Sequence, residues 1–361
     1  MKKNHLNYVD SIKGIAMILV VWGHCGSKNY FYNTLYYIHL PIFIIISGCL
    51  LKYNNSWMKD NFSDILKKKT KQIMYPFFSF GFLSIIRFYY LNTRYNTNIS
   101  LVWRIKEIFM LGFDACWFLP ALYIGVILSI VFIKIATKKK KSLNLSLMFI
   151  QITMAIIACI IKHILWTRYI SYSEHAFEEN QFIHMLLIIC RSLFFSFFIL
   201  MGYILNDILL SVNKWNNKIK LNIIIALICI LSVLVMITIR LGFVDLRTVY
   251  FKNTSVYLSI GSVGAISIII ICSIINIKSK ILSYIGRNSL IIMGVHFTFG
   301  LIDIANDLWY KCSLSNISNN TVDSVMITII VLLLSAIFVE IFNKSFPYIL
   351  NYNKLVEKLK K

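Results

Sequence analysis

Residues 8–24 read YVDSIKGIAMILVVWGH, an apolar segment about as long as the helix that is needed to cross a lipid bilayer. Hydrophobic residues make up 58% of the 361-residue chain and charged residues 14%, whereas soluble domains contain roughly 45–50% and 25%. Such a chain lacks the polar surface that a soluble enzyme, a secreted disulfide-bonded domain or a disordered protein needs. The sequence therefore predicts an all-α polytopic membrane helix bundle. About ten transmembrane helices are expected, at 8–25, 34–51, 73–91, 117–136, 147–166, 183–205, 221–239, 255–277, 282–302 and 324–342.

The basic residues indicate how these spans are oriented. The chain contains 37 Lys and Arg but only 15 Asp and Glu, a formal net charge of +22. With both termini cytoplasmic, 23 basic residues lie in cytoplasmic segments and 9 in outer loops, which agrees with the positive-inside rule. We therefore assign the charge to membrane orientation and expect no nucleic acid partner. The loops are short, so 1–361 is expected to form one integral-membrane domain without a soluble domain. The outer loop 92–116 is expected to contain an interfacial helix.

Polar residues inside the first two spans indicate a site, because ionisable groups cost several kcal/mol within a bilayer. Lys13 and His24 share one face of a helix and lie about 16 Å apart along its axis. Asp10 lies one turn before Lys13 and is expected to pair with it. His39 in the second span has a depth similar to that of His24, and Pro41 frees a backbone carbonyl nearby. The pattern favours acid–base chemistry by imidazoles, with a cationic inner entrance.

Other interpretations of these polar residues stay open. Asp10 and Lys13 can form an ion pair at the inner membrane surface, with His24 as an interfacial histidine. Arg191 either extends to the surface or binds an anion, and His296 is either a core histidine or part of the site. The seven histidines show no HExxH pattern and the eight cysteines no ligand spacing, so we expect no metal site and no disulfide framework.

The chain resembles the bacterial acyltransferase-3 family of integral membrane acyltransferases. Its first span contains an Asp, a Lys followed by Gly, and a His after ten intervening residues, as in the opening segment of that family. The second span reads IHLPIF at 38–43 and ISG at 46–48, where Phe-His-Met is more common than Ile-His-Leu. Two later stretches are similar as well, WFLPAL at 117–122 and IGRNSL at 285–290. A Lys at position 13 is typical of the sugar O-acetyltransferase branch.

The resemblance implies transfer of an acetyl group from cytoplasmic acetyl-CoA to a hydroxyl of a cell-envelope glycan, such as O-antigen, capsule or exopolysaccharide, in the bacterial inner membrane. His24 would act as general base or carry the acetyl group as a covalent relay. No bound cofactor is expected besides the acetyl donor, and the expected partners are a lipid-linked or surface glycan and membrane lipids. The expected roles are catalysis for His24, His39 and Asp10, donor binding for Lys13 and Arg191, and acceptor contact or support for Ser47, His296 and Trp117.

Two other classes of membrane protein fit part of the pattern. A transporter or flippase for a glycan intermediate would show paired half-repeats or interrupted helices in corresponding places, and the sequence shows neither. A polysaccharide polymerase or lipid-linked glycosyltransferase would favour a long outer loop with carboxylates or Arg pairs, whereas these outer loops are short. Oligomeric state and the acceptor hydroxyl are left open.

Overall fold

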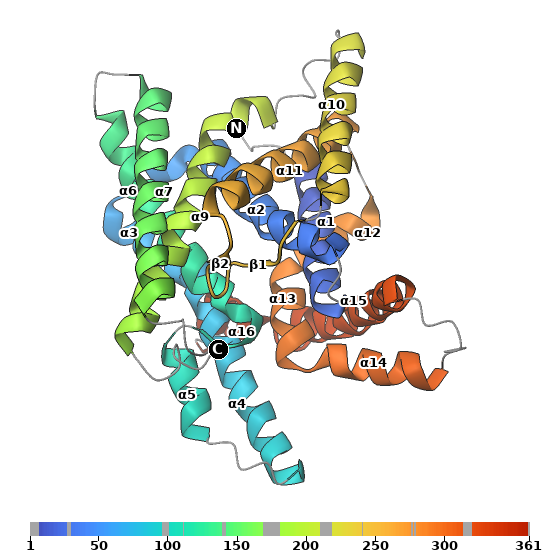
Figure 1. The fold of residues 1–361 in the computed structure, drawn as a ribbon. Coiled ribbons are helices and arrows are strands. Elements are labelled where there is room, and N and C mark those ends of the chain that lie inside the picture. Colours follow the sequence, from blue (N-terminus) through green and yellow to red (C-terminus); the bar gives the residue numbers. More distant parts are fainter. Residues whose placement is uncertain are drawn as a thin grey trace.

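A computed structural model describes the chain except for residues 1–6, 27–29, 96–100, 111, 139–141, 169–180, 210–218, 240, 276, 278, 313–319 and 360–361. The described part is a bundle of helices with one two-stranded antiparallel hairpin (Figure 1), which confirms the predicted all-α membrane fold. Its elements are α1 (Asn7–Cys25), α2 (Tyr30–Tyr53), η1 (Asn55–Lys59), α3 (Phe62–Lys69), η2 (Thr70–Met74), α4 (Tyr75–Tyr95), α5 (Leu101–Phe109), η3 (Asp114–Trp117), α6 (Phe118–Thr137), α7 (Leu143–Arg168), α9 (Gln181–Leu209), α10 (Ile219–Thr238), β1 (Val244–Asp245), β2 (Tyr250–Phe251), α11 (Thr254–Ile275), α12 (Lys280–Arg287), α13 (Ser289–Thr298), α14 (Leu301–Cys312), α15 (Asn320–Lys344), α16 (Pro347–Leu350) and α17 (Tyr352–Leu359).

Many of these helices have the length and composition of membrane spans. Among the described residues, seven helices are long and apolar enough to cross a membrane, or eight if the bent pair α13 and α14 forms one span. α4, on the predicted span 73–91, is not among them, and the apolar part of α10 is short, at Asn222–Thr238. Ten spans and cytoplasmic termini therefore stay a prediction.

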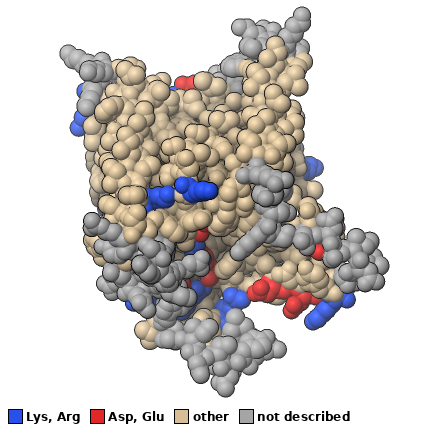
Figure 2. Space-filling view, in the orientation of Figure 1, with Lys and Arg blue, Asp and Glu red and all other residues tan. Residues whose placement is uncertain are grey.

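The outer surface of the bundle is apolar, as a lipid-facing surface requires. Figure 2 shows that uncharged residues cover most of one face of the molecule, while charged side chains gather in a few small groups. Large apolar side chains on α7 and α10 are exposed, with Phe149 at 73% and Leu227 at 59% of their full accessible surface. Loop 92–116 contains a helix, α5, where an interfacial helix is expected, and its position at the membrane surface stays a prediction.

The predicted ninth span over 282–302 is wrong as a single helix. The chain forms α12 and α13 in succession and then bends by 70° into α14. The bend occurs at Gly300, whose φ of +63° lies in the left-handed region. A Cβ at this glycine would also lie 2.3 Å from the Arg87 guanidinium, so glycine meets both the backbone and the steric requirement.

Two helix pairs in the centre of the bundle touch at their backbones. α1 packs on α12, where a Cβ at Gly14 would lie 2.1 Å from the Leu282 carbonyl oxygen. α2 packs on α9, where a Cβ at Gly48 would lie 2.0 Å from the Ile199 carbonyl oxygen. Small residues permit such close approach between membrane helices. Because these contacts fix the rotation of α1 and α2, they decide which side chains of the two helices face the interior.

Candidate active site

A cavity of about 420 Å³ lies between α1, α2, η3, α6, α13 and the hairpin of β1 and β2. One stripe of α1 lines its length, because Lys13, Met17, Val20 and His24 follow one another at intervals of three or four residues. This is the shared face that the spacing of Lys13 and His24 predicts. The ionisable groups at the two ends of the stripe therefore open into the same cavity.

The facing wall is a stripe of α2. Tyr36, His39, Phe43 and Ser47 line the cavity, again at helical spacing. The Ser47 hydroxyl donates a hydrogen bond to the Phe43 carbonyl oxygen at 2.8 Å, so its proton is directed at its own helix. The two spans singled out from the sequence thus form opposite sides of one chamber.

Three imidazoles gather near the His24 end of the cavity. The ring centroids of His24 and His296 are 5.3 Å apart. Tyr36 contacts both His24, at 6.5 Å, and His39, at 5.1 Å, in edge-to-face geometry. The Tyr36 hydroxyl donates to the Gly23 carbonyl oxygen at 3.2 Å and accepts from the Tyr32 hydroxyl at 2.8 Å. Tyr36 therefore links α1 to α2 between the histidines.

Backbone contacts fix the neutral tautomer of two of these histidines. His39 Nδ1 lies 2.5 Å from the Leu35 carbonyl oxygen, and His296 Nδ1 lies 2.9 Å from that of Ile292. A carbonyl oxygen only accepts hydrogen bonds, so each Nδ1 carries the proton and each Nε2 presents a lone pair. The Nε2 atom of His296 is fully buried and has no hydrogen-bond partner among the described residues. It is thus a free acceptor next to the His24 ring.

The hairpin and η3 add charged groups that the sequence analysis did not single out. Asp114, Asp245 and Arg247 line the cavity. Asp245 Oδ1 accepts from the Arg247 backbone amide at 2.7 Å, and Oδ2 accepts from the Thr248 hydroxyl at 2.9 Å. Asp114 has a φ of +42°, which is rare outside glycine. Asp114 begins the short η3, Asp245 ends the two-residue β1 and Arg247 follows β1, so none of them belongs to an element long enough to show a periodic pattern in the sequence.

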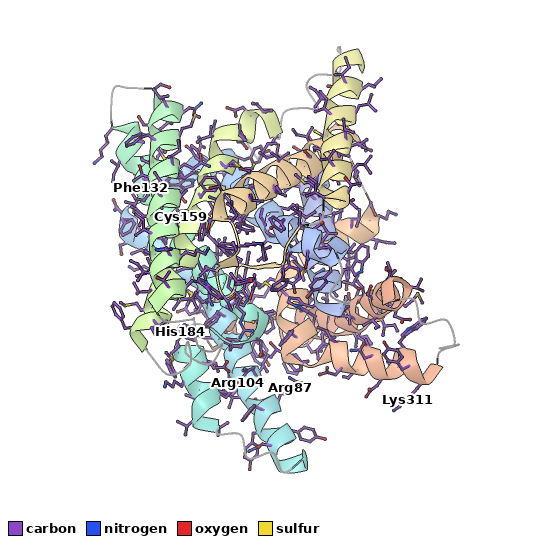
Figure 3. All side chains as sticks on the ribbon, in the orientation of Figure 1. Arg87, Arg104, Phe132, Cys159, His184 and Lys311 are labelled. Carbon is purple, nitrogen blue, oxygen red and sulfur yellow. The ribbon has the colours of Figure 1, made fainter. Side chains whose placement is uncertain are left out.

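Asp114 is held in place by a buried ion-pair cluster. Arg104 is 8% exposed, bonds to Asp114 and also donates to Glu107 at 2.8 Å. Figure 3 shows Arg104 and Arg87 near each other at the end of the bundle formed by α4 and α5. Among the described residues, no group of three or more His, Cys, Asp or Glu side chains is placed to hold a metal ion.

Comparison with known proteins identifies the family. Residues 6–340 match the acyltransferase-3 family, which is described as an acyltransferase domain. The chain belongs to the acyltransferase-3 family. No curated protein and no solved structure matches the chain. The cavity of Lys13, His24 and His39 is therefore the candidate active site of a membrane acyltransferase.

The expected ion pair of Asp10 with Lys13 is not among the ion pairs of the described residues, although the charge of Asp10 acts on Lys13. Asp10 instead accepts from Arg287 Nε at 2.8 Å. The cause is the close packing of α1 on α12, since a Cβ at Gly286 would lie 1.8 Å from the Asp10 carbonyl oxygen. Asp10 therefore joins the two helices of the acyltransferase, and it does not line the cavity. Its expected catalytic role has no support in this geometry.

The other expected site residues of the acyltransferase fall into two groups. Trp117 lines the cavity, whereas Arg191 lies behind it with its guanidinium carbon 5.1 Å from the Trp117 ring centroid. Arg191 is 4% exposed, and its Nε and Nη1 atoms have no hydrogen-bond partner among the described residues. The structure thus brings together Lys13, His24, His39, Ser47 and Trp117 around the cavity, places His296 beside His24, and leaves Arg191 and Asp10 outside.

Acyl transfer needs a base for the acceptor hydroxyl, a hydrogen-bond donor for the carbonyl oxygen and a place for the donor. His24 is a candidate base, because its ring lines the cavity and lies beside the free Nε2 lone pair of His296. Lys13 supplies a positive charge at the other end of the cavity. The cavity therefore presents a candidate base and a positive charge for the acyl donor, two of the three parts that acyl transfer needs.

Proposed function

We propose that the protein is an O-acetyltransferase of the bacterial inner membrane that moves an acetyl group from cytoplasmic acetyl-CoA to a hydroxyl of a cell-envelope glycan. The observation that carries this proposal is the single cavity that holds Lys13 at one end and His24 with His39 at the other. An acetyl donor that enters from the Lys13 end meets a histidine cluster only after passing most of the length of α1.

Lys13 and the basic loops near the termini fit an anionic donor. The phosphates of acetyl-CoA are attracted by fixed positive charge, and a lysine binds them as a point charge. Lys13 and His24 lie about 16 Å apart along the helix axis. The long pantetheine arm of acetyl-CoA separates its phosphates from its thioester, so the two ends of the cavity match the two ends of the donor.

In the proposed step, His24 takes the proton of the acceptor hydroxyl while the hydroxyl oxygen attacks the thioester carbonyl carbon. The carbon–sulfur bond then breaks, and the thiolate of CoA leaves with the proton returned by His24. The Nε2 lone pair of His296, which has no hydrogen-bond partner among the described residues, would accept the N–H of the second ring nitrogen of His24 once that ring turns toward it, and would so orient the base. The Nε2 lone pair of His39 accepts a hydrogen bond from the acceptor and so holds it in place. A direct transfer and an acetyl-His24 relay share these groups.

The test compares the surface polysaccharide of the host with and without the gene by proton NMR of O-acetyl signals. The deletion strain is complemented with wild type, His24→Ala, Lys13→Ala and the control His163→Ala, whose side chain is exposed on α7. We expect wild type and the control to restore acetylation and both site variants to fail at matched membrane levels. Unchanged acetylation in the deletion strain would contradict the glycan acceptor. A change in chain length or export would favour a polymerase or flippase instead.

A further inference from the structure

A second hollow lies at the junction of two segments that are far apart in the sequence. It encloses about 630 Å³ between α3 with η2 on one side and residues 350–353, which join α16 to α17, on the other. We call it the C-terminal groove; it is lined by Asp64, Lys67, Lys68, Lys71, Gln72, Leu350, Asn351, Tyr352 and Asn353. It shares no lining residue with the cavity of Lys13 and His24.

The two walls of the groove are tied together by Tyr75. Its hydroxyl donates to the Tyr348 carbonyl oxygen at 2.7 Å, and its ring lies 5.6 Å from the Tyr352 ring. The Lys71 ammonium sits 4.5 Å from the centroid of the Tyr352 ring, a cation–π contact across the groove. These contacts fix the two walls of the groove relative to each other, with the aromatic wall packed against the basic one.

The charge of the groove is positive and largely unneutralised. Lys67, Lys68 and Lys71 are all exposed, and within the described part of the chain none of them forms a salt bridge. Asp64 is the one carboxylate among the lining residues. Burial of the Lys69 ammonium lowers its pKa, and the positive charge of neighbouring Lys68 lowers it further. The groove thus gathers three ammonium groups against one carboxylate, beside the amides of Gln72, Asn351 and Asn353.

One wall of the groove lies outside the family match. The acyltransferase-3 match ends at residue 340, whereas residues 350–353 belong to the segment that follows. One wall of the groove is therefore the basic helix α3, which lies within the family match, and the other wall is the segment that follows the match. The loop charges predict that this end of the bundle faces the cytoplasm.

We propose that the C-terminal groove binds phosphate ester groups. Convergent ammonium groups bind phosphate oxygens through charge-assisted hydrogen bonds, and the adjacent amides can donate to the same oxygens. Two molecules present phosphate esters at a cytoplasmic membrane surface. One is an anionic lipid, through its headgroup, and the other is a nucleotide such as that in CoA. The proposal does not depend on the proposed acetyl transfer.

The test uses the full chain in lipid nanodiscs and has one arm for each source. The first arm measures binding of 3′,5′-ADP in phosphatidylcholine discs by calorimetry. The second measures enrichment of spin-labelled phosphatidylglycerol around the protein. The variant carries Lys67→Gln, Lys68→Gln and Lys71→Gln, and the control carries Lys59→Gln, Lys138→Gln and Lys280→Gln, which remove equal charge from exposed sites outside the groove.

We expect the groove variant to bind at least tenfold more weakly than the control in one arm, and that arm identifies the source. Asp64→Asn should strengthen the same binding by a few fold, a gain that misfolding does not produce. The proposal is overturned if the groove variant and the control bind equally in both arms. It is also overturned if Asp64→Asn weakens the binding or leaves it unchanged.

Discussion

The imidazole rings of His24 and His296 lie 5.3 Å apart although they come from opposite ends of the chain. The Nδ1 proton of His296 is committed to the Ile292 carbonyl oxygen, and its Nε2 lone pair is buried without a partner in the described part of the chain. An unpaired buried acceptor costs about 1–3 kcal/mol, so a structure that keeps one is expected to use it. The nearest use is to hold His24 in the orientation of a base.

The first prediction separates the roles of the two ring nitrogens of His296. Asn at this position can retain the hydrogen bond to the Ile292 carbonyl oxygen but leaves no acceptor near His24, whereas Gln places an amide closer to the Nε2 position. We expect His296→Asn to lower kcat by about 10–100-fold with little change in the KM for acetyl-CoA. His296→Gln should keep more of the activity. Steady-state kinetics in nanodiscs measure both, and equal activity of the Asn variant and wild type would contradict the orienting role.

The second prediction separates donor binding from chemistry at Lys13. Lys13→Arg keeps the charge at its end of the cavity, and Lys13→Met removes it while filling similar space. We expect Lys13→Met to raise the KM for acetyl-CoA at least tenfold, because a buried charge-assisted hydrogen bond contributes about 1.5–3 kcal/mol. Lys13→Arg should stay within a few fold of wild type, since it still presents a cation to phosphate. A fall in kcat with unchanged KM would place Lys13 in the chemical step instead.

The sequence predicts those parts of the site that follow helical periodicity. Lys13 and His24 share a face because helix geometry fixes their angle, and the cavity confirms that face. The bond from Arg287 to Asp10 could not be predicted, because it depends on how closely α12 approaches α1, which the Gly14 and Gly286 contacts decide. That approach is a tertiary property of two distant segments.

The positions of Asp114 and Asp245 could not be predicted from the sequence, for a related reason. Asp114 lines the cavity from a left-handed backbone conformation that Arg104 holds, and Asp245 lines it from the end of the two-residue strand β1. Neither position follows a helical or strand period. The break at Gly300 was equally hidden, because this glycine lies inside the apolar stretch 297–302, which is interrupted only by Thr298. A glycine in the sequence indicates such a bend only when the neighbouring side chain that excludes a Cβ there, in this case Arg87, is known.

The third prediction concerns the buried cluster of Arg104, Glu107 and Asp114. Arg104→Met leaves two carboxylates largely buried without their cation, and breaking such a pair costs roughly 3–5 kcal/mol. We expect a clear drop in thermal stability together with lower activity, because Asp114 lines the cavity. The exposed Lys106 on the same helix is the matched control, and Lys106→Met should melt within a degree or two of wild type. Equal melting of the two variants would contradict the structural role of Arg104.

The fourth prediction tests the backbone contact between α1 and α12. A Cβ at Gly14 or Gly286 would lie about 2 Å from a carbonyl oxygen of the other helix, closer than any real contact, so the helices must separate. We expect Gly14→Ala and Gly286→Ala each to cost about 1–3 kcal/mol, as overpacking does. Because α1 then shifts, Lys13 and His24 move relative to His39, and activity should fall further than stability. Gly242→Ala is the control, since a Cβ there would meet nothing within 4 Å. Thermal unfolding and acetyl-transfer rates in the same nanodiscs measure both effects, and wild-type behaviour of Gly14→Ala and Gly286→Ala would show that α1 and α12 do not pack this closely.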